Sequence, residues 1–403
     1  MKKFICFVSL ISLLVPWAGV RAQTFTNYTT ENGLPSNSVS GVAIDGSNVK
    51  WFATLTGVAK LEDSTWTVYT TADGLIDNSI NCIAVDADNH VWAGTDAGIS
   101  MFDGSQWVSY TAADGLVNDM ISYIAGDPDG SVWIGTVAGL SHFDGTTWTS
   151  YTTATGLGAD YISYIAVDDN GDKWFGTWLG GVSKYDGTAV TTFTTADSLL
   201  DNSVIAIAID EQGNKWIGTY YGITILDSLD RFVQNITAED GLYNIFVHDI
   251  AVDTKGIVWI GMYDDYTQDG GVSRYHQSIW TSFTVSDGLV NAFVRRLAVD
   301  QENTVWVATA NGVSKITIDD SGIRDIRESG MTISPNPADE SIRISGITGD
   351  VTMKITDLTG KDMMMQSLGT GADRVDISRL APGLYLVQFY RGTDVFVTKL
   401  IVR

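Results

Sequence analysis

The sequence predicts an all-β protein: a seven-bladed β-propeller closed by strands from both ends of its repeat region, followed by a small β-sandwich. Three observations support this fold class. A tryptophan-led phrase recurs seven times, short apolar segments between Gly and Asp turns fill each repeat, and period-2 alternation marks several segments near the C-terminus. The 403 residues include 41 Gly and 13 Trp, as a turn-rich repeat array requires.

The repeat has a period of about 40–45 residues, which is typical of propeller blades. Its phrase reads WFAT, WAGT, WIGT, WFGT, WIGT, WIGM and WVAT along the chain. The phrases begin at Trp51, Trp92, Trp133, Trp174, Trp216, Trp259 and Trp306. One complete repeat predicts four strands, as a blade needs: residues 80–85, 91–95, 98–102 and 107–111.

The two ends of the repeat region complete one another. The seventh repeat stops after its third strand, VSKITID, and lacks an outer strand. The segment 25–30 near the N-terminus matches the outer strand and turn of the next repeat, residues 66–71. We therefore expect the N-terminal segment to close the seventh blade, which hides two sheet edges. A solenoid with capped ends is the alternative, and the complementary truncation argues against it.

Residues 1–22 resemble a secretory signal peptide. Lys2 and Lys3 form its basic start, an apolar run covers residues 4–15, and Val20-Arg21-Ala22 offers a small-residue cleavage site. An uncleaved membrane anchor is the alternative, although the apolar run is short for a bilayer span. We expect the propeller to occupy residues 23–322, a linker 323–330 and a separate domain 331–403.

The propeller repeats resemble a known family. The phrases DGLIDNSINCIAVD, VWAGTDAGISMFDG and KWFGTWLGGVSKYDG resemble the two-component regulator propeller repeat, over about residues 24–318. That family implies the periplasmic sensor part of hybrid two-component receptors, many of which detect glycan fragments. We expect no transmembrane helix, kinase or DNA-binding segment after this propeller, so the resemblance implies the fold and not the signalling role.

The C-terminal segment resembles the type A sorting domain of the type IX secretion system. The phrases SPNPADESIRIS, ITDLTGKDM, ISRLAPGLYLVQF and KLIVR carry this resemblance over residues 331–403. It implies a partner in the secretion machinery, export across the outer membrane, and a secreted or cell-surface location. Alternation predicts strands at residues 341–344, 351–355, 384–387 and 397–402. A small accessory adhesion sandwich is the alternative.

Composition excludes several classes of function. Asp and Glu number 48 against 24 Lys and Arg, a net charge of −24, which argues against binding to nucleic acids or anionic membranes. Of the two cysteines, Cys6 lies in the expected signal peptide, so Cys82 has no partner for a disulfide. We expect Cys82 to be a buried, inert thiol. The sequence predicts no cofactor and no metal site.

Residues that recur in every repeat build the scaffold, and residues that break the repeat are candidates for function. An aspartate ends each innermost strand just before a turn, and such aspartates bond to their own backbone. These residues are Asp45, Asp86, Asp127, Asp168, Asp210, Asp253 and Asp300. We expect them, and the recurring tryptophans, to be structural.

The exceptions gather in the loops of repeats four to seven. The loop after the tryptophan phrase is bland in the first three repeats, for example Leu55-Thr56, and becomes aromatic and longer afterwards. The first position of the inner strand changes from Ser or Asn to Ile205, His248 and Arg295. The predicted ligand-binding residues are Trp178, Tyr220, Tyr221, Tyr243, His248, Tyr263, Asp264, Tyr266 and Arg295. Flat rings with a few polar groups suit a glycan or protein ligand. The alternative is that these residues only pack longer loops.

Catalysis is a second possibility. A pair of carboxylates could hydrolyse sugars, drawn from Asp264 or Asp265 with Asp269 or Asp249. His248 with Tyr263 or Arg295 could instead catalyse an elimination. Calcium binding at Asp264, Asp265 and Asp269 is conceivable, but the spacing does not match an EF-hand loop. A purely structural surface protein is the third possibility, and the sequence favours a non-catalytic binding module.

Overall fold

The computed structural model describes residues 22–276, 279–319, 323–357, 361–391 and 394–403. The expected signal peptide therefore lies outside the described residues, apart from residue 22. Thr24–Thr317 forms one compact unit, and Ile318–Arg403 belongs to a second. Within the described residues, no helix has the length and apolar character needed to cross a bilayer.

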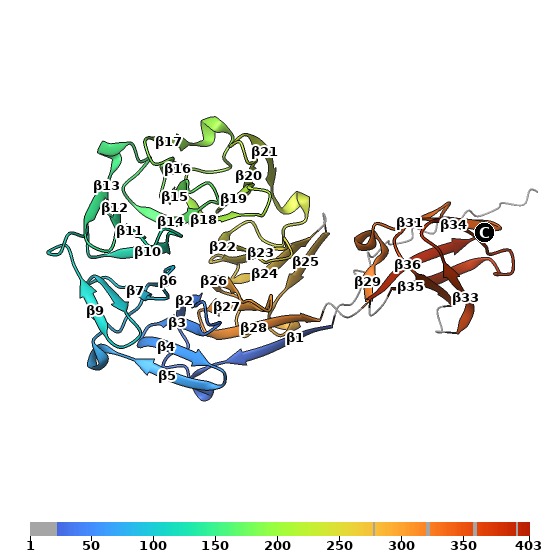
Figure 1. Ribbon diagram of the computed structural model, residues 1–403, viewed down its shortest axis with the longest axis horizontal. Helices are drawn as coiled ribbons and strands as arrows, with labels where there is room; N and C mark the ends of the chain where they lie inside the picture. The colour runs from blue at the N-terminus through green and yellow to red at the C-terminus, as the bar shows by residue number, and fades with distance from the viewer. Residues whose placement is uncertain (1–21, 277–278, 320–322, 358–360, 392–393) are drawn as a thin grey trace, which may run out of the picture. The chain divides into compact units, whose positions relative to one another are not determined.

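The described residues of the first unit form seven four-stranded sheets, each running from an inner to an outer strand (Figure 1). The first three are β2 (Val39–Ile44), β3 (Lys50–Thr54), β4 (Gly57–Glu62), β5 (Thr65–Tyr69); β6 (Cys82–Val85), β7 (Val91–Gly94), β8 (Ile99–Phe102), β9 (Trp107–Tyr110); and β10 (Ile121–Gly126), β11 (Val132–Thr136), β12 (Gly139–Phe143), β13 (Trp148–Tyr151). The next three are β14 (Ile162–Val167), β15 (Lys173–Thr177), β16 (Val182–Tyr185), β17 (Val190–Phe193); β18 (Val204–Ile209), β19 (Lys215–Thr219), β20 (Gly222–Leu226), β21 (Phe232–Ile236); and β22 (Val247–Val252), β23 (Val258–Asp264), β24 (Asp269–His276), β25 (Ile279–Phe283). The last is β26 (Val294–Val299), β27 (Val305–Thr309), β28 (Gly312–Asp319) and β1 (Ala22–Tyr28).

These sheets form a closed ring (Figure 1). Each inner strand contacts the inner strand of the next sheet, and β26 contacts β2. The outer strand of the last sheet is β1, paired with β28, as the two truncated ends predict. Asn27 supports this closure: its Nδ2 donates to the carbonyl of Gly288 at 3.0 Å, and its Oδ1 accepts the hydroxyl of Ser314 at 2.7 Å. The predicted propeller fold is confirmed.

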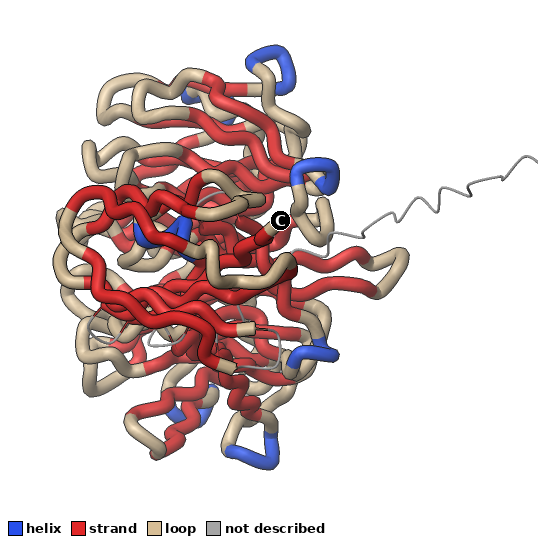
Figure 2. Tube along the Cα trace, turned by 90° about the vertical axis from the view of Figure 1, so that its right-hand side faces the viewer, coloured by secondary structure: helices blue, strands red, loops and turns tan. Residues whose placement is uncertain are grey.

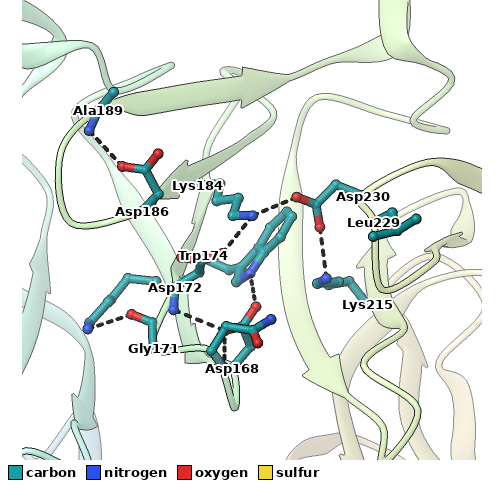
Figure 3. A network of polar contacts seen from close by, with 12 residues as sticks. Asp168, Gly171, Asp172, Trp174, Lys184, Asp186, Ala189, Lys215, Leu229 and Asp230 are labelled. Carbon is teal, nitrogen blue, oxygen red and sulfur yellow. Dashed lines mark hydrogen bonds and ion pairs between the residues drawn. The ribbon is translucent and has the colours of Figure 1, made fainter.

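The turn aspartates and the recurring tryptophans are bonded to each other. In the turn after β14, Asp168 Oδ1 accepts the backbone N–H groups of Asn170 and Asp172 at 3.0 and 2.9 Å. Its Oδ2 accepts the indole N–H of Trp174 at 3.2 Å (Figure 3). The same indole bond, at 2.8–3.2 Å, occurs in all seven sheets of the described chain, between residues six apart. The structural role predicted for these aspartates is confirmed, and the tryptophan is the partner that the sequence did not reveal.

Short 3-10 helices follow most of the outer strands in the part of the chain that the structure describes (Figure 2). Thr and Asp cap them reciprocally: the Asp73 carboxylate accepts the N–H and hydroxyl of Thr70 at 2.9 and 3.0 Å. Gly115 explains the recurring Asp-Gly pair, because its φ is +126° and a Cβ there would lie 2.7 Å from the Trp148 ring of the next sheet. These helices are η1 (Thr30–Asn32), η2 (Thr71–Asp73), η3 (Thr153–Thr155), η4 (Thr195–Asp197), η5 (Ala238–Asp240) and η6 (Val285–Asp287).

The second unit packs a five-stranded sheet against a three-stranded one. The first sheet has the order β29 (Ile323–Asp325), β36 (Asp394–Val402), β35 (Gly383–Arg391), β32 (Val351–Thr356), β33 (Asp362–Leu368); the second is β30 (Thr332–Ser334), β31 (Ser341–Ile347), β34 (Gly371–Asp376), and a helix η7 (Ile326–Ser329) follows β29. Ile344 and Val375 share one core with Met353 and Phe389, so the two sheets form the predicted sandwich. β29 lies in the segment expected as a linker and pairs in parallel with β36.

The aspartate–tryptophan link leads to a first prediction. Asp168→Ala leaves two turn N–H groups and the buried indole without their acceptor, so the free energy of unfolding should fall by about 2–4 kcal/mol. Urea unfolding followed by tryptophan fluorescence measures this loss. Asp169→Ala is the matched control, because Asp169 is exposed and should change stability by less than about 0.5 kcal/mol. Equal effects of the two substitutions would contradict the role given to Asp168.

Candidate functional site

A β-bulge near the start of the inner strand aims one side chain at the neighbouring sheet. Six inner strands of the described chain have this bulge. A bulge leaves its extra residue outside the ladder and redirects the side chain. The hydroxyl of Ser122 donates to the carbonyl of Ile162 in the next sheet, and that of Ser163 to Val204. The bulged residues are Ser40, Ser122, Ser163, Ile205, His248 and Arg295.

His248 is the bulged residue of β22, and it faces aromatic rings. Its Nε2 lies 3.1 Å from the carbonyl oxygen of Tyr263, which can only accept, so Nε2 donates. The imidazole lies 5.3 Å from the Phe293 ring and 6.4 Å from that of Tyr220, while Tyr263 stacks on Phe293 at 4.2 Å with planes 8° apart. Burial, helped by the charge of Arg296, lowers the pKa of His248 to about 4. The imidazole is therefore neutral at neutral pH.

The ring contacts continue along the same face. Tyr220 lies 6.1 Å from Phe246 and 5.8 Å from Trp178, and Trp178 stacks with Tyr161 at 6.2 Å. Trp178 and Tyr161 are 39% and 42% exposed, which leaves ring faces open to a ligand. Tyr161, Phe246 and Phe293 come from the loops between sheets, so the sequence shows them as loop aromatics without revealing their contacts. We call these residues the aromatic arc: Tyr161, Trp178, Tyr220, Phe246, His248, Tyr263 and Phe293.

Three of the predicted aromatic residues lie outside these ring contacts. Tyr221 and Tyr266 are 59% and 92% exposed. Tyr243 donates its hydroxyl to the Asp269 carboxylate at 2.9 Å. They extend from the same loops as the arc, and their part in binding stays a prediction.

Asp264 and Asp265 have different surroundings. Asp264 is half-buried and accepts the hydroxyl of Thr267 at 2.7 Å, a bond that lowers the pKa of its carboxyl. This bond stabilises the turn of its own loop. Burial raises the pKa of Tyr220, and the negative charge of Asp265 raises it further. The charge of Asp265 also acts on His248. The charge of Asp265 thus acts on two members of the arc, and the part of Asp264 in binding stays a prediction.

Three of the carboxylates considered for sugar hydrolysis, Asp249, Asp264 and Asp269, are engaged in hydrogen bonds within the protein. Asp249 is 2% exposed and accepts the hydroxyl of Tyr164 at 2.8 Å and the N–H of Leu297 at 2.6 Å. Asp269 accepts the hydroxyl of Tyr243. Asp249 is therefore closed to a ligand in this structure.

Arg295 bonds across the junction between β26 and β2. Its Nη1 donates to Ser38 Oγ at 3.0 Å and to the carbonyl of Val39 at 3.4 Å. This is the inter-sheet bond that serine makes elsewhere in the ring. The guanidinium also lies 5.2 Å from the Phe293 ring, at the end of the arc. Arg295 therefore closes the ring as well as bordering the site.

The centre of the ring is nearly filled. Arg296 lies 5.4 Å from the Tyr123 ring and 5.7 Å from that of Tyr164, beside a cavity of about 50 Å³. Such a cavity holds about one water and no ligand. Cys82 lines it, and burial raises the pKa of the thiol to about 12, in agreement with the inert role predicted.

The chain shows no arrangement of three or more His, Cys, Asp or Glu side chains suited to a metal ion, as far as its described residues extend. Asp264, Asp265 and Asp269 do not form one.

Two family models match the chain. The two component regulator propeller model matches residues 74–97, 115–138 and 198–221. The secretion system C-terminal sorting domain model matches residues 332–403. A comparison with curated protein sequences found no match.

Solved structures share the fold. The extracellular domain of a putative hybrid two component system from B. thetaiotaomicron superposes with a TM-score of 0.65 and 19% identity, over 94% of this chain and 57% of that one. PorZ, a surface component of the type-IX secretion system of Porphyromonas gingivalis, gives 0.61 and 20%, over 92% and 60%. Virginiamycin B lyase from Staphylococcus aureus gives 0.60 and 15%, over 74% and 100%. The chain thus spans less than two thirds of the first two proteins.

These matches agree with both resemblances read from the sequence. The chain carries two component regulator propeller repeats and a type IX secretion sorting domain. The sorting domain indicates export to the cell surface or outside.

The buried imidazole leads to a pH prediction. Because the folded pKa of His248 is about 4 and its ordinary value is 6.5, the unfolded chain binds this proton more readily, and stability falls as pH decreases between these values. Between pH 7.5 and 5 this costs about 2 kcal/mol. His248→Gln should lose that part of the pH dependence in urea unfolding, while His142→Gln serves as the comparison. A wild-type pH profile in the His248 variant would contradict the buried, neutral imidazole.

Proposed function

We propose that this secreted surface propeller, which carries two component regulator propeller repeats and a type IX sorting domain, is a non-catalytic binding module for an extracellular glycan or protein. The observation that carries the proposal is the aromatic arc. Its rings continue without a break across the loops of neighbouring sheets, and the corresponding loops of the first three sheets carry residues such as Leu55 and Ala97 instead.

The chemistry of the arc favours a ligand without strong negative charge. His248 is neutral, Arg295 is engaged with Ser38 and Val39, and the negative charge of Asp265 acts on Tyr220 and His248. Ring faces beside a few polar groups bind sugar rings and peptide side chains through stacking and hydrogen bonds. The exposed Tyr221, Tyr243 and Tyr266 extend this surface.

An extracellular lyase or hydrolase is the rival function. The likeness to virginiamycin B lyase is one of fold, and fold alone does not imply activity. His248 has its Nε2 bonded to a backbone carbonyl, so only Nδ1 could accept a proton from a ligand.

A structural role without a ligand is the third possibility. The partner of the C-terminal domain, in all three cases, is the type IX secretion machinery.

Binding is tested with glycan and peptide arrays, followed by affinity measurement on the hits. Trp178→Ala combined with Tyr263→Ala should weaken binding at least about tenfold, because each stacked ring contributes on the order of 1 kcal/mol. Leu55→Ala is the matched control, since it changes a 57% exposed side chain in the equivalent loop of the first sheet and should leave affinity unchanged.

Product analysis on the same hits separates binding from catalysis. We expect bound ligand to be recovered intact. Release of product that disappears in His248→Ala would establish the enzyme instead. Unchanged binding in the double variant would mean that the arc only packs its loops.

A further inference from the structure

The face of the propeller opposite the arc contains the same lysine–tryptophan–lysine arrangement twice. Between β14–β17 and the next sheet, the Nζ atoms of Lys184 and Lys215 lie 5.3 and 5.1 Å from the centre of the Trp174 ring. Where the ring closes, the Nζ atoms of Lys315 and Lys50 lie 5.5 and 5.4 Å from Trp306. The residues occupy equivalent positions. In each case one lysine lies in the third strand of the tryptophan's own sheet, and the other is the first residue of the second strand of the next sheet.

In the first arrangement a carboxylate of the chain joins the two ammonium groups. Asp230 Oδ2 lies 2.6 Å from Lys184 Nζ and Oδ1 lies 2.8 Å from Lys215 Nζ, as Figure 3 shows. Asp172 adds a second carboxylate at 2.7 Å from Lys184. Asp230 belongs to the turn between β20 and β21, at a φ of +63°. The lysine pair around a tryptophan is thus a carboxylate site, already filled from within the protein.

At the ring closure a cavity of about 330 Å³ takes the place of that carboxylate. Thr304 stands where the first arrangement has Asp172, and the turn between β4 and β5 is shorter than that between β20 and β21. Among the described residues, Lys315 forms no ion pair. Lys50 Nζ donates a hydrogen bond to the carbonyl of Asn48 at 2.7 Å and pairs with the Asp300 carboxylate at 3.3 Å. One of its three N–H donors is left for a ligand.

The cavity is lined by carboxylates as well as by lysines. Glu62, Asp63 and Glu302 line it, and Glu62 pairs with Lys60 at 2.7 Å. A simple anion would meet repulsion from Asp63 and Glu302 while it bonded to the lysines. A ligand with both a carboxylate and an ammonium group matches the two sets of charges. The volume is in the range of small-ligand sites.

We propose that this cavity binds a zwitterionic ligand, a short peptide of about dipeptide size. Its carboxylate lies between Lys50 and Lys315, as that of Asp230 lies between Lys215 and Lys184. Its ammonium group lies against Asp63 and Glu302. The cavity is built from turns at the end of the strands opposite to the loops of the arc, so this site is independent of the proposed binding function.

Calorimetric titration of the full-length protein with glycylglycine tests the proposal. We expect one binding site, at least about tenfold weaker binding of N-acetylglycine, which lacks the ammonium group, and no binding of glycinamide, which lacks the carboxylate. Lys315→Gln should weaken binding at least about tenfold, the usual effect of losing a charge-assisted hydrogen bond. Lys184→Gln is the matched control, because its site is filled by Asp230, and it should leave the affinity unchanged. Circular dichroism verifies that each variant is folded.

A second variant tests the premise itself. Asp230→Gly empties the filled site, and glycine accepts the positive φ at this position. Acetate at tens of millimolar should then restore part of the thermal stability that the substitution removes. The proposal is overturned if glycylglycine does not bind, if N-acetylglycine binds equally well, if Lys315→Gln binds as the wild type does, or if acetate leaves the Asp230 variant unchanged.

Discussion

The hydrogen bond between the turn aspartate and the indole of the recurring tryptophan is the interaction on which the rest of the propeller depends. One carboxylate oxygen holds the turn between the first two strands, and the other fixes the indole at 2.8–3.2 Å. A fixed indole can pack on the adjoining sheet: Trp306 contacts Phe52 there and stacks on Tyr28 of its own sheet. A single link within each repeat therefore sets both the turn and the spacing between sheets.

Because this scaffold is complete in every repeat, other positions are free to differ. The bulge in the inner strand is the main one, since it points a side chain out of the ladder. Serine uses it to bond the next sheet, and Arg295 does the same with a longer side chain. His248 instead joins the rings of Tyr263 and Phe293. The same backbone feature thus closes the ring in one place and builds the candidate site in another.

The repeat made the fold predictable, because spacing, turn residues and complementary ends depend on local chemistry. Strand boundaries were predicted within a few residues: the inner strand expected from residue 80 begins at Cys82. Contacts between sheets were not predictable, because they join residues distant in sequence. The sequence could therefore not tell that Asp249 is buried against Tyr164, or that the charge of Asp265 acts on Tyr220 and His248.

Hydrogen–deuterium exchange of the protein with and without a ligand identified on the arrays shows directly whether the aromatic arc binds it, because it maps binding on the wild-type chain. We expect slower exchange in residues 177–181, 243–248 and 262–269, while the exchange of the corresponding loops at 54–57, 95–98 and 136–139 stays unchanged. Protection confined to those bland loops, or to the sorting domain, would contradict binding at the arc.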